Sequence, residues 1–146
     1  MTIATLSQEA QQTLSTWHEL LEQNAMEKLD QLLSDDVVFR SPAAHTPYPG
    51  RDAIKLVLKT VNTVFEEFTY HRRFASEDGN SVVLEFSAKV GDKSVKGIDM
   101  IRFDEAGKIV DFEVMIRPLS GLQALAGEMG KRVAPYLAML KGEAAQ

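Results

Sequence analysis

Residues 97–119 contain two runs rich in β-branched and aromatic side chains, separated by an acidic turn at residues 104–107 that ends in glycine. This arrangement predicts a β-hairpin. Alternation along the first run places Asp99 on the same face as Ile101 and Phe103. A lone carboxylate in an apolar row lies either in solvent at a strand edge or inside a pocket.

The preceding strand favours the pocket. Apolar side chains occupy alternate positions in residues 82–90, and residues 91–92 predict a turn into the next strand. A two-residue loop places Leu84 opposite Asp99 and brings Phe86 to the same face. Asp99 is therefore expected on the core face, where burial raises the pKa of a carboxyl above ~3.9 and leaves it neutral at pH 7.

Apolar residues at helical spacing predict three helices before these strands and one after them. The expected starts are Ser7, Asn24 as a cap, and Arg51. The C-terminal helix is expected over residues 119–141, with breaks near Gly130 and Pro135. Helices followed by a long antiparallel run predict an α+β fold, with a curved, mostly antiparallel sheet wrapped around the three N-terminal helices.

Shorter strands are expected at residues 37–39 and 68–74, where Phe68, Tyr70 and Phe74 would share one face. The 146 residues predict a single domain over residues 1–146, with a frayed start at residues 1–6.

Charge and composition exclude several classes of function. A net charge of -5 and a pI near 5.2 argue against a nucleic-acid surface. We expect no membrane span, because no run approaches ~18 apolar residues, and no signal peptide. The absence of cysteine excludes thiol catalysis and cysteine-bound zinc and fits a cytoplasmic protein. Asp99 has no second ligand on its face, so we expect no metal and no cofactor.

Residues 98–109 resemble the corresponding strand and turn of bacterial ketosteroid isomerase, and residues 17–54 align with that enzyme without a gap. More broadly, the chain resembles the nuclear transport factor 2-like superfamily, including SnoaL-type polyketide cyclases, over a core of about residues 7–117. This resemblance implies a conical sheet with an internal cavity; the C-terminal helix lies outside the isomerase pattern.

Only some of the functional residues of the isomerase have counterparts at the matching positions of this chain. Asp99 falls where the isomerase keeps a protonated aspartic acid that donates a hydrogen bond to the substrate oxyanion; its raised pKa is established for that enzyme. Trp17 falls where the family has its oxyanion-hole tyrosine. Ser41 falls where the family has its general-base aspartate, and a serine hydroxyl cannot take up a carbon-bound proton at neutral pH without its own base. We therefore do not expect a competent ketosteroid isomerase.

The proline-containing loop at residues 41–50 carries the other polar candidates. His45 is either a general base, with an ordinary pKa near ~6.5, or a surface histidine without a role. Tyr48 is a candidate hydrogen-bond donor at the pocket rim. His18 is expected to be structural, and His71 to face away from the pocket.

The remaining candidate ligand-binding residues are the apolar side chains expected to line the cavity: Leu58, Phe65, Leu84, Phe86, Ile101, Phe103, Phe112, Val114 and Ile116. Such a cavity suits a small hydrophobic molecule with a carbonyl or hydroxyl group. One hypothesis is an isomerase, cyclase or hydrolase that uses Asp99 as acid and His45 as base. The other is a non-catalytic ligand-binding or dimerisation module that has lost the base.

The opposite sheet face predicts a partner surface. It mixes apolar side chains with both signs of charge: Val83, Ile98, Met100 and Met115 with Glu85, Lys96, Arg102 and Glu113. A solvated sheet would be more uniformly polar. We therefore expect a homodimer through this outer face.

Overall fold

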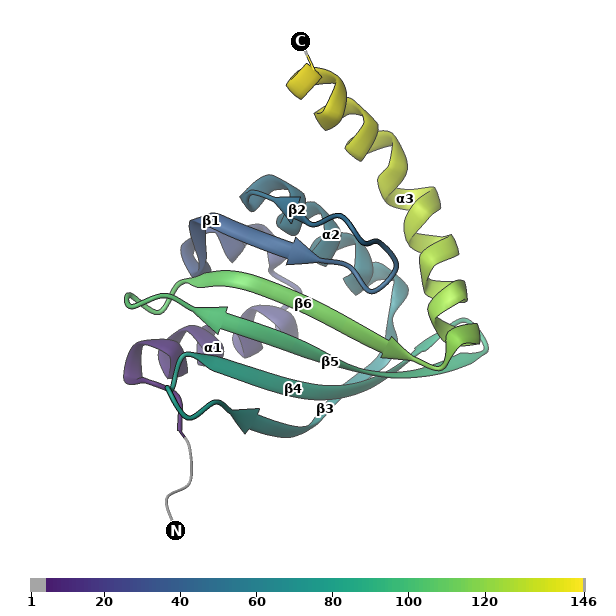
Figure 1. Ribbon diagram of the computed structural model, residues 1–146. Coiled ribbons are helices and arrows are strands. Elements are labelled where there is room, and N and C mark those ends of the chain that lie inside the picture. The colour runs from purple at the N-terminus through teal and green to yellow at the C-terminus, as the bar shows by residue number, and fades with distance from the viewer. Residues whose placement is uncertain (1–4, 146) are drawn as a thin grey trace.

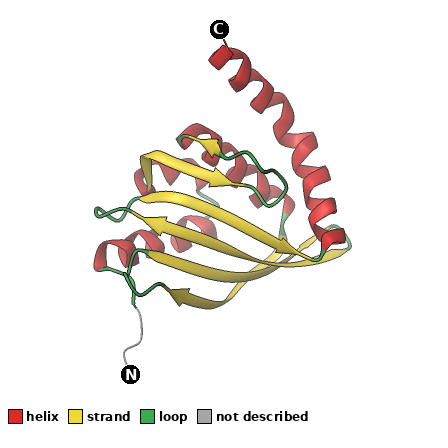
Figure 2. Cartoon of the chain, in the orientation of Figure 1, coloured by secondary structure: helices red, strands yellow, loops and turns green. Residues whose placement is uncertain are grey.

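The computed structural model describes residues 5–145, with side chains described as far as residue 136. Six strands form one curved sheet in the order β2-β1-β6-β5-β4-β3, and helices cover its concave face (Figures 1 and 2). The elements run in the order α1 (Gln8–Glu22), the 3₁₀ helix η1 (Met26–Leu32), β1 (Leu33–Arg40), β2 (Tyr48–Pro49), α2 (Arg51–Val64), β3 (Glu66–Ala75), β4 (Ser81–Val90), β5 (Lys93–Phe103), β6 (Ile109–Arg117) and α3 (Leu119–Ala145). The predicted α+β fold is confirmed.

The start of α1 is fixed by its cap. The Ser7 hydroxyl accepts a hydrogen bond from the Ala10 backbone N–H at 3.2 Å, as expected for an N-cap serine. The expectation of a frayed start is wrong for Leu6, which is buried because it packs into the main core. Residues 1–4 lie outside the described part of the chain.

Two boundaries between α1 and β1 differ from expectation. Asn24 does not cap η1: it adopts a left-handed φ of 53°, and Ala25 occupies the N-cap without a side-chain bond. Asparagine tolerates this conformation better than most residues, so Asn24 turns the chain out of α1. β1 begins at Leu33, four residues before the strand expected at residues 37–39.

The predicted strand register is confirmed. Leu84 pairs with Asp99 and Val90 with Lys93. Glycine is required at position 97, because an added Cβ would collide with the Met115 carbonyl oxygen on β6. β6 pairs antiparallel with β5 and parallel with β1, which makes the sheet mixed.

A register shift in β3 overturns one expectation. Tyr70 pairs with Phe86, but Arg73 rather than residue 72 pairs with Leu84. One extra residue reverses which face the following side chains occupy. Phe74 is consequently exposed on the outer face, whereas Tyr70 points inward.

The C-terminal helix α3 closes one end of the cone before its last turns stand clear of the sheet (Figure 1). Leu125 is buried with Val64 of α2 and Val95 of β5. The expected breaks at Gly130 and Pro135 are wrong, because the helix runs through both. A proline removes only one helical hydrogen bond, and the neighbouring turns carry the helix past it.

Candidate functional site

The concave side of the sheet encloses a cavity of about 360 Å³. Its walls come from the sheet, α1, α2, α3 and the start of the 41–50 loop. Nine of the predicted site residues line it: Trp17, Ser41, Tyr48, Leu58, Phe65, Asp99, Phe112, Val114 and Ile116.

Five predicted site residues do not line the cavity. Leu84, Phe86, Ile101 and Phe103 are buried behind other side chains; the ring of Phe68, for example, covers Phe86 at a centroid distance of 5.0 Å.

His45 is exposed on the loop and is not a lining residue. The structure therefore does not bring His45 to Asp99, and its role as a base stays a prediction.

Asp99 meets a partner that the sequence did not reveal. The Tyr70 hydroxyl donates to Asp99 Oδ2 at 2.6 Å, and the Trp17 indole N–H donates to the Tyr70 oxygen at 3.1 Å. The chain of three groups joins α1, β3 and β5. Alternation did place Tyr70 on the inner face, but it did not show that the phenol reaches across β4 to β5.

Burial controls the ionisation of Asp99. The side chain lies between Leu84 and Val114 on the neighbouring strands, and only 6% of the residue is exposed. Burial raises the pKa of Asp99 from 3.8 to about 7, against a smaller lowering by the hydrogen bond from Tyr70. The raised pKa agrees with the expectation, but at about 7 it leaves the carboxyl only partly neutral at pH 7, where it exchanges between its acid and its ionised form.

The Tyr70 ring is held from two sides. It makes edge-on contacts with Phe68 at 4.8 Å and with His18 at 5.3 Å between ring centroids. Burial, with the nearby Asp99 carboxylate, raises the pKa of Tyr70 well above 10. Burial also lowers the pKa of His18 below 6.5, and Arg73 adds to this. The phenol is thus a fixed, neutral hydrogen-bond donor.

Helix α3 supplies a wall of the cavity that was not predicted. Its lining residues include Leu122, Leu125, Met129 and Val133. The apolar stripe of the C-terminal helix was the sequence signal for this wall, but nothing in the stripe indicated which surface it would cover.

Apart from Tyr70, no described polar group that lines the cavity hydrogen-bonds to Asp99. Ser41 Oγ accepts a hydrogen bond from the Ala43 N–H at 3.1 Å, which caps a local turn. In the described part of the chain, no three His, Cys, Asp or Glu residues gather as a metal site would require. Likewise, no described helix has the length and hydropathy to cross a membrane.

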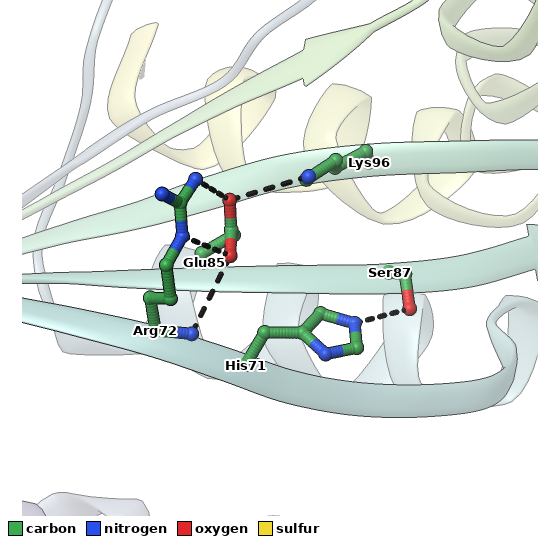
Figure 3. Close-up of polar contacts among 5 residues, drawn as sticks. All are labelled: His71, Arg72, Glu85, Ser87 and Lys96. Carbon is green, nitrogen blue, oxygen red and sulfur yellow. Dashed lines mark hydrogen bonds and ion pairs between the residues drawn. The ribbon is translucent and has the colours of Figure 1, made fainter.

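The outer sheet face carries a second polar network (Figure 3). Arg72 binds both carboxylate oxygens of Glu85, at 2.9 and 2.6 Å, and Lys96 lies 3.3 Å from one of them. The hydrogen bond from Arg72 is the main reason that the pKa of Glu85 falls to about 2. His71 contacts Ser87 on this face, which confirms that it points away from the cavity.

Comparison with known proteins gives consistent results. The family model of the SnoaL-like domain matches residues 14–112. A crystal structure of a steroid delta-isomerase from Pseudomonas aeruginosa is 58% identical, with a TM-score of 0.88, over 92% of this chain and 98% of that one. No protein with a curated description matches the chain in sequence.

Two further solved structures share the fold. An uncharacterised Silicibacter pomeroyi DSS-3 protein with a cystatin-like fold is 35% identical, with a TM-score of 0.82, over 92% of this chain and 94% of that one. The epoxide hydrolase/cyclase-like enzyme SalBIII, with a role in pyran ring formation in the polyether salinomycin, is 15% identical, with a TM-score of 0.64, over 78% of this chain and 94% of that one. The likeness to SalBIII shows the fold alone.

Proposed function

The chain belongs to the SnoaL-like domain family within the nuclear transport factor 2-like superfamily, and we propose that it is an isomerase-like enzyme for a small hydrophobic molecule with a carbonyl or hydroxyl oxygen. Asp99 would hydrogen-bond or protonate that oxygen. The family includes enzymes of this class, but its fold also carries other functions, so the site has to support the assignment.

The observation that carries the proposal is a single ionisable carboxyl inside an apolar cavity. Among the described residues that line it, Asp99 is the only charged one, and its pKa of about 7 suits proton transfer near neutral pH. The apolar walls would hold the body of the ligand and exclude water, and the carboxyl would fix the position of its oxygen.

A panel of small hydrophobic ketones, enones and epoxides tests this function, with products followed by mass spectrometry. We expect at least one compound to be converted faster than in buffer. Asp99→Asn should lower that rate by roughly 10²–10⁴-fold, because the amide cannot give or take the proton.

The matched control is Asp92→Asn, which removes a carboxylate from an exposed turn and should leave the rate unchanged. Equal loss in both variants, or a panel that is neither bound nor converted, would contradict the proposal.

A non-catalytic ligand-binding module is the second candidate. Ser41 supports it, because the residue at the expected base position has a hydroxyl occupied in a local turn. In that case, the panel should bind without conversion. Quenching of Trp17, the only tryptophan in the chain and a lining residue, would report the binding.

The steroid substrate of the Pseudomonas aeruginosa relative is not part of the proposal. The description of that protein as a steroid delta-isomerase supports the isomerase-like class. A ketosteroid reaction requires a base at carbon in addition to a donor at oxygen, and Asp99 alone cannot serve as both in one turnover.

We also propose that the outer sheet face pairs with a second copy of the chain. Phe74 and Met115 are 54% and 44% exposed there, beside charges of both signs such as Lys96 and Glu113. A two-fold interface brings the same patch together from both copies, so a surface with both signs can be complementary to itself.

Met100→Asp should weaken this dimer, because it would place a charge without a partner in the interface. Sedimentation velocity at micromolar concentration should show a dimer for the natural sequence and a shift toward monomer for the variant. Ser15→Asp, on the exposed side of α1, is the control and should remain dimeric. A monomer for the natural sequence at that concentration would contradict the proposal.

A further inference from the structure

Only one of the two oxygens of the Asp99 carboxyl accepts a hydrogen bond from a described group. Tyr70 donates to Oδ2, and no other described group hydrogen-bonds the carboxyl. Asp99 also lines the cavity. Oδ1 is therefore the oxygen that remains for a bound molecule.

Trp17 sets the direction of the bond between Tyr70 and Asp99. An indole N–H can only donate, and here it donates to the Tyr70 oxygen. If Asp99 donated to the same oxygen, the hydroxyl hydrogen of Tyr70 would be left without an acceptor. Buried polar groups are normally satisfied, so the hydroxyl points at Oδ2 whether or not Asp99 is protonated.

We propose that Tyr70 is a positioning residue which, directed by Trp17, reserves Oδ1 of Asp99 as the one oxygen that gives or takes the proton. The inference rests on the proposed function only in assuming that a substrate exists. The position of the proton on Asp99 does not depend on a bound ligand. It changes the expectation for Trp17, whose N–H is engaged by Tyr70 and is not a donor to the ligand.

This arrangement predicts a pH-dependent choice of ligand. When Oδ1 carries the proton, it donates to a carbonyl oxygen. When the carboxyl is ionised, Oδ1 accepts from a ligand hydroxyl and repels a carbonyl oxygen. The site would therefore prefer carbonyl compounds below the pKa of Asp99 and hydroxyl compounds above it.

Few other titratable groups face this site. The described lining residues of α2, α3 and β6 carry no charge, and the residue opposite Asp99 on β4 is Leu84. Tyr48 lines the same cavity without a hydrogen bond to Asp99. His18 lies beyond the Tyr70 ring, and burial lowers its pKa, the direction opposite to the shift at Asp99.

Two NMR titrations without any ligand test the proposal: the carboxyl carbon of Asp99 and the indole N–H of Trp17, which is a single resonance. In the natural sequence both should change with one midpoint, because Tyr70 connects them. Tyr70→Phe should raise the Asp99 midpoint by roughly one to two pH units, since the ionised form loses a hydrogen bond. It should also abolish the matching change at Trp17.

Tyr48→Phe removes a hydroxyl from the same cavity and should alter neither titration. The proposal would be overturned if the indole resonance of the natural sequence did not change at the pH at which Asp99 titrates. This measurement does not require Tyr70→Phe to fold. An unchanged midpoint in a folded Tyr70→Phe would also overturn the proposal, since a merely structural tyrosine would affect stability alone. Because no substrate is present, neither result depends on whether the panel of compounds is converted.

Discussion

Replacing Ser41 with aspartate should bring the isomerisation of a Δ5-3-ketosteroid from no measurable turnover to a measurable rate, because a general base usually contributes roughly 10²–10⁴-fold. The natural chain should show no measurable turnover, because no described lining residue other than Asp99 carries a charge. Ser41→Asp would add a carboxylate at the position that corresponds to the general base of ketosteroid isomerase. Absorbance of the conjugated ketone product measures the rate.

The control for this gain is Ala44→Asp, which introduces the same charge at another lining position of the same loop. It should not reproduce the increase, because its carboxylate would lie away from the expected base position. Turnover by the natural sequence close to that of a competent isomerase would show that Ser41 does not occupy the position of the general base.

The sequence predicted the hairpin and the burial of Asp99 because both depend on local rules. Strand alternation and a two-residue turn determine which residues pair, and the pair of Leu84 with Asp99 followed directly. The same rule failed at Phe74, because one extra residue in β3 reverses the faces. A register shift depends on the curvature of the whole sheet, which alternation does not encode.

The candidate site was only partly predictable for a related reason. Alternation states which face a side chain occupies, but not how far it reaches or what covers it. Tyr70 spans from β3 to Asp99 on β5, whereas Phe86 on the same face is covered by Phe68. The loop conformation that leaves His45 exposed has no periodic signal in the sequence.

Asp99 should make the protein less stable as pH rises from about 4 to about 7. Its pKa is 3.8 as an ordinary aspartate and about 7 in the folded chain. Below a pH of 3.8 the carboxyl is protonated in both the folded and the unfolded chain, so it does not lower the free energy of unfolding. Between the two values the unfolded chain releases its proton first, so ionisation favours unfolding. Above the folded pKa both states are ionised and the penalty stops growing.

The expected size of this effect is large for one side chain. A rise of about three pH units at ~1.36 kcal/mol each gives a penalty on the order of 4 kcal/mol. Burial of Asp99 means that solvent screens little of it. His18 acts in the opposite direction, because its lowered pKa makes the protein more stable as pH rises toward 6.5.

Urea unfolding at pH 4 and pH 8 separates these contributions when the natural sequence is compared with Asp99→Asn. The variant keeps His18 and every other titrating group, so its pH dependence reports their sum. The change in the difference between the two proteins from pH 4 to pH 8 then isolates Asp99, and it should approach the full penalty. Asp92→Asn should retain the pH dependence of the natural sequence. Parallel pH curves for Asp99→Asn and the natural sequence would mean that Asp99 is ionised in the folded state at its ordinary pKa, and both the proton-transfer role and the apolar surroundings of this carboxyl would have to be abandoned.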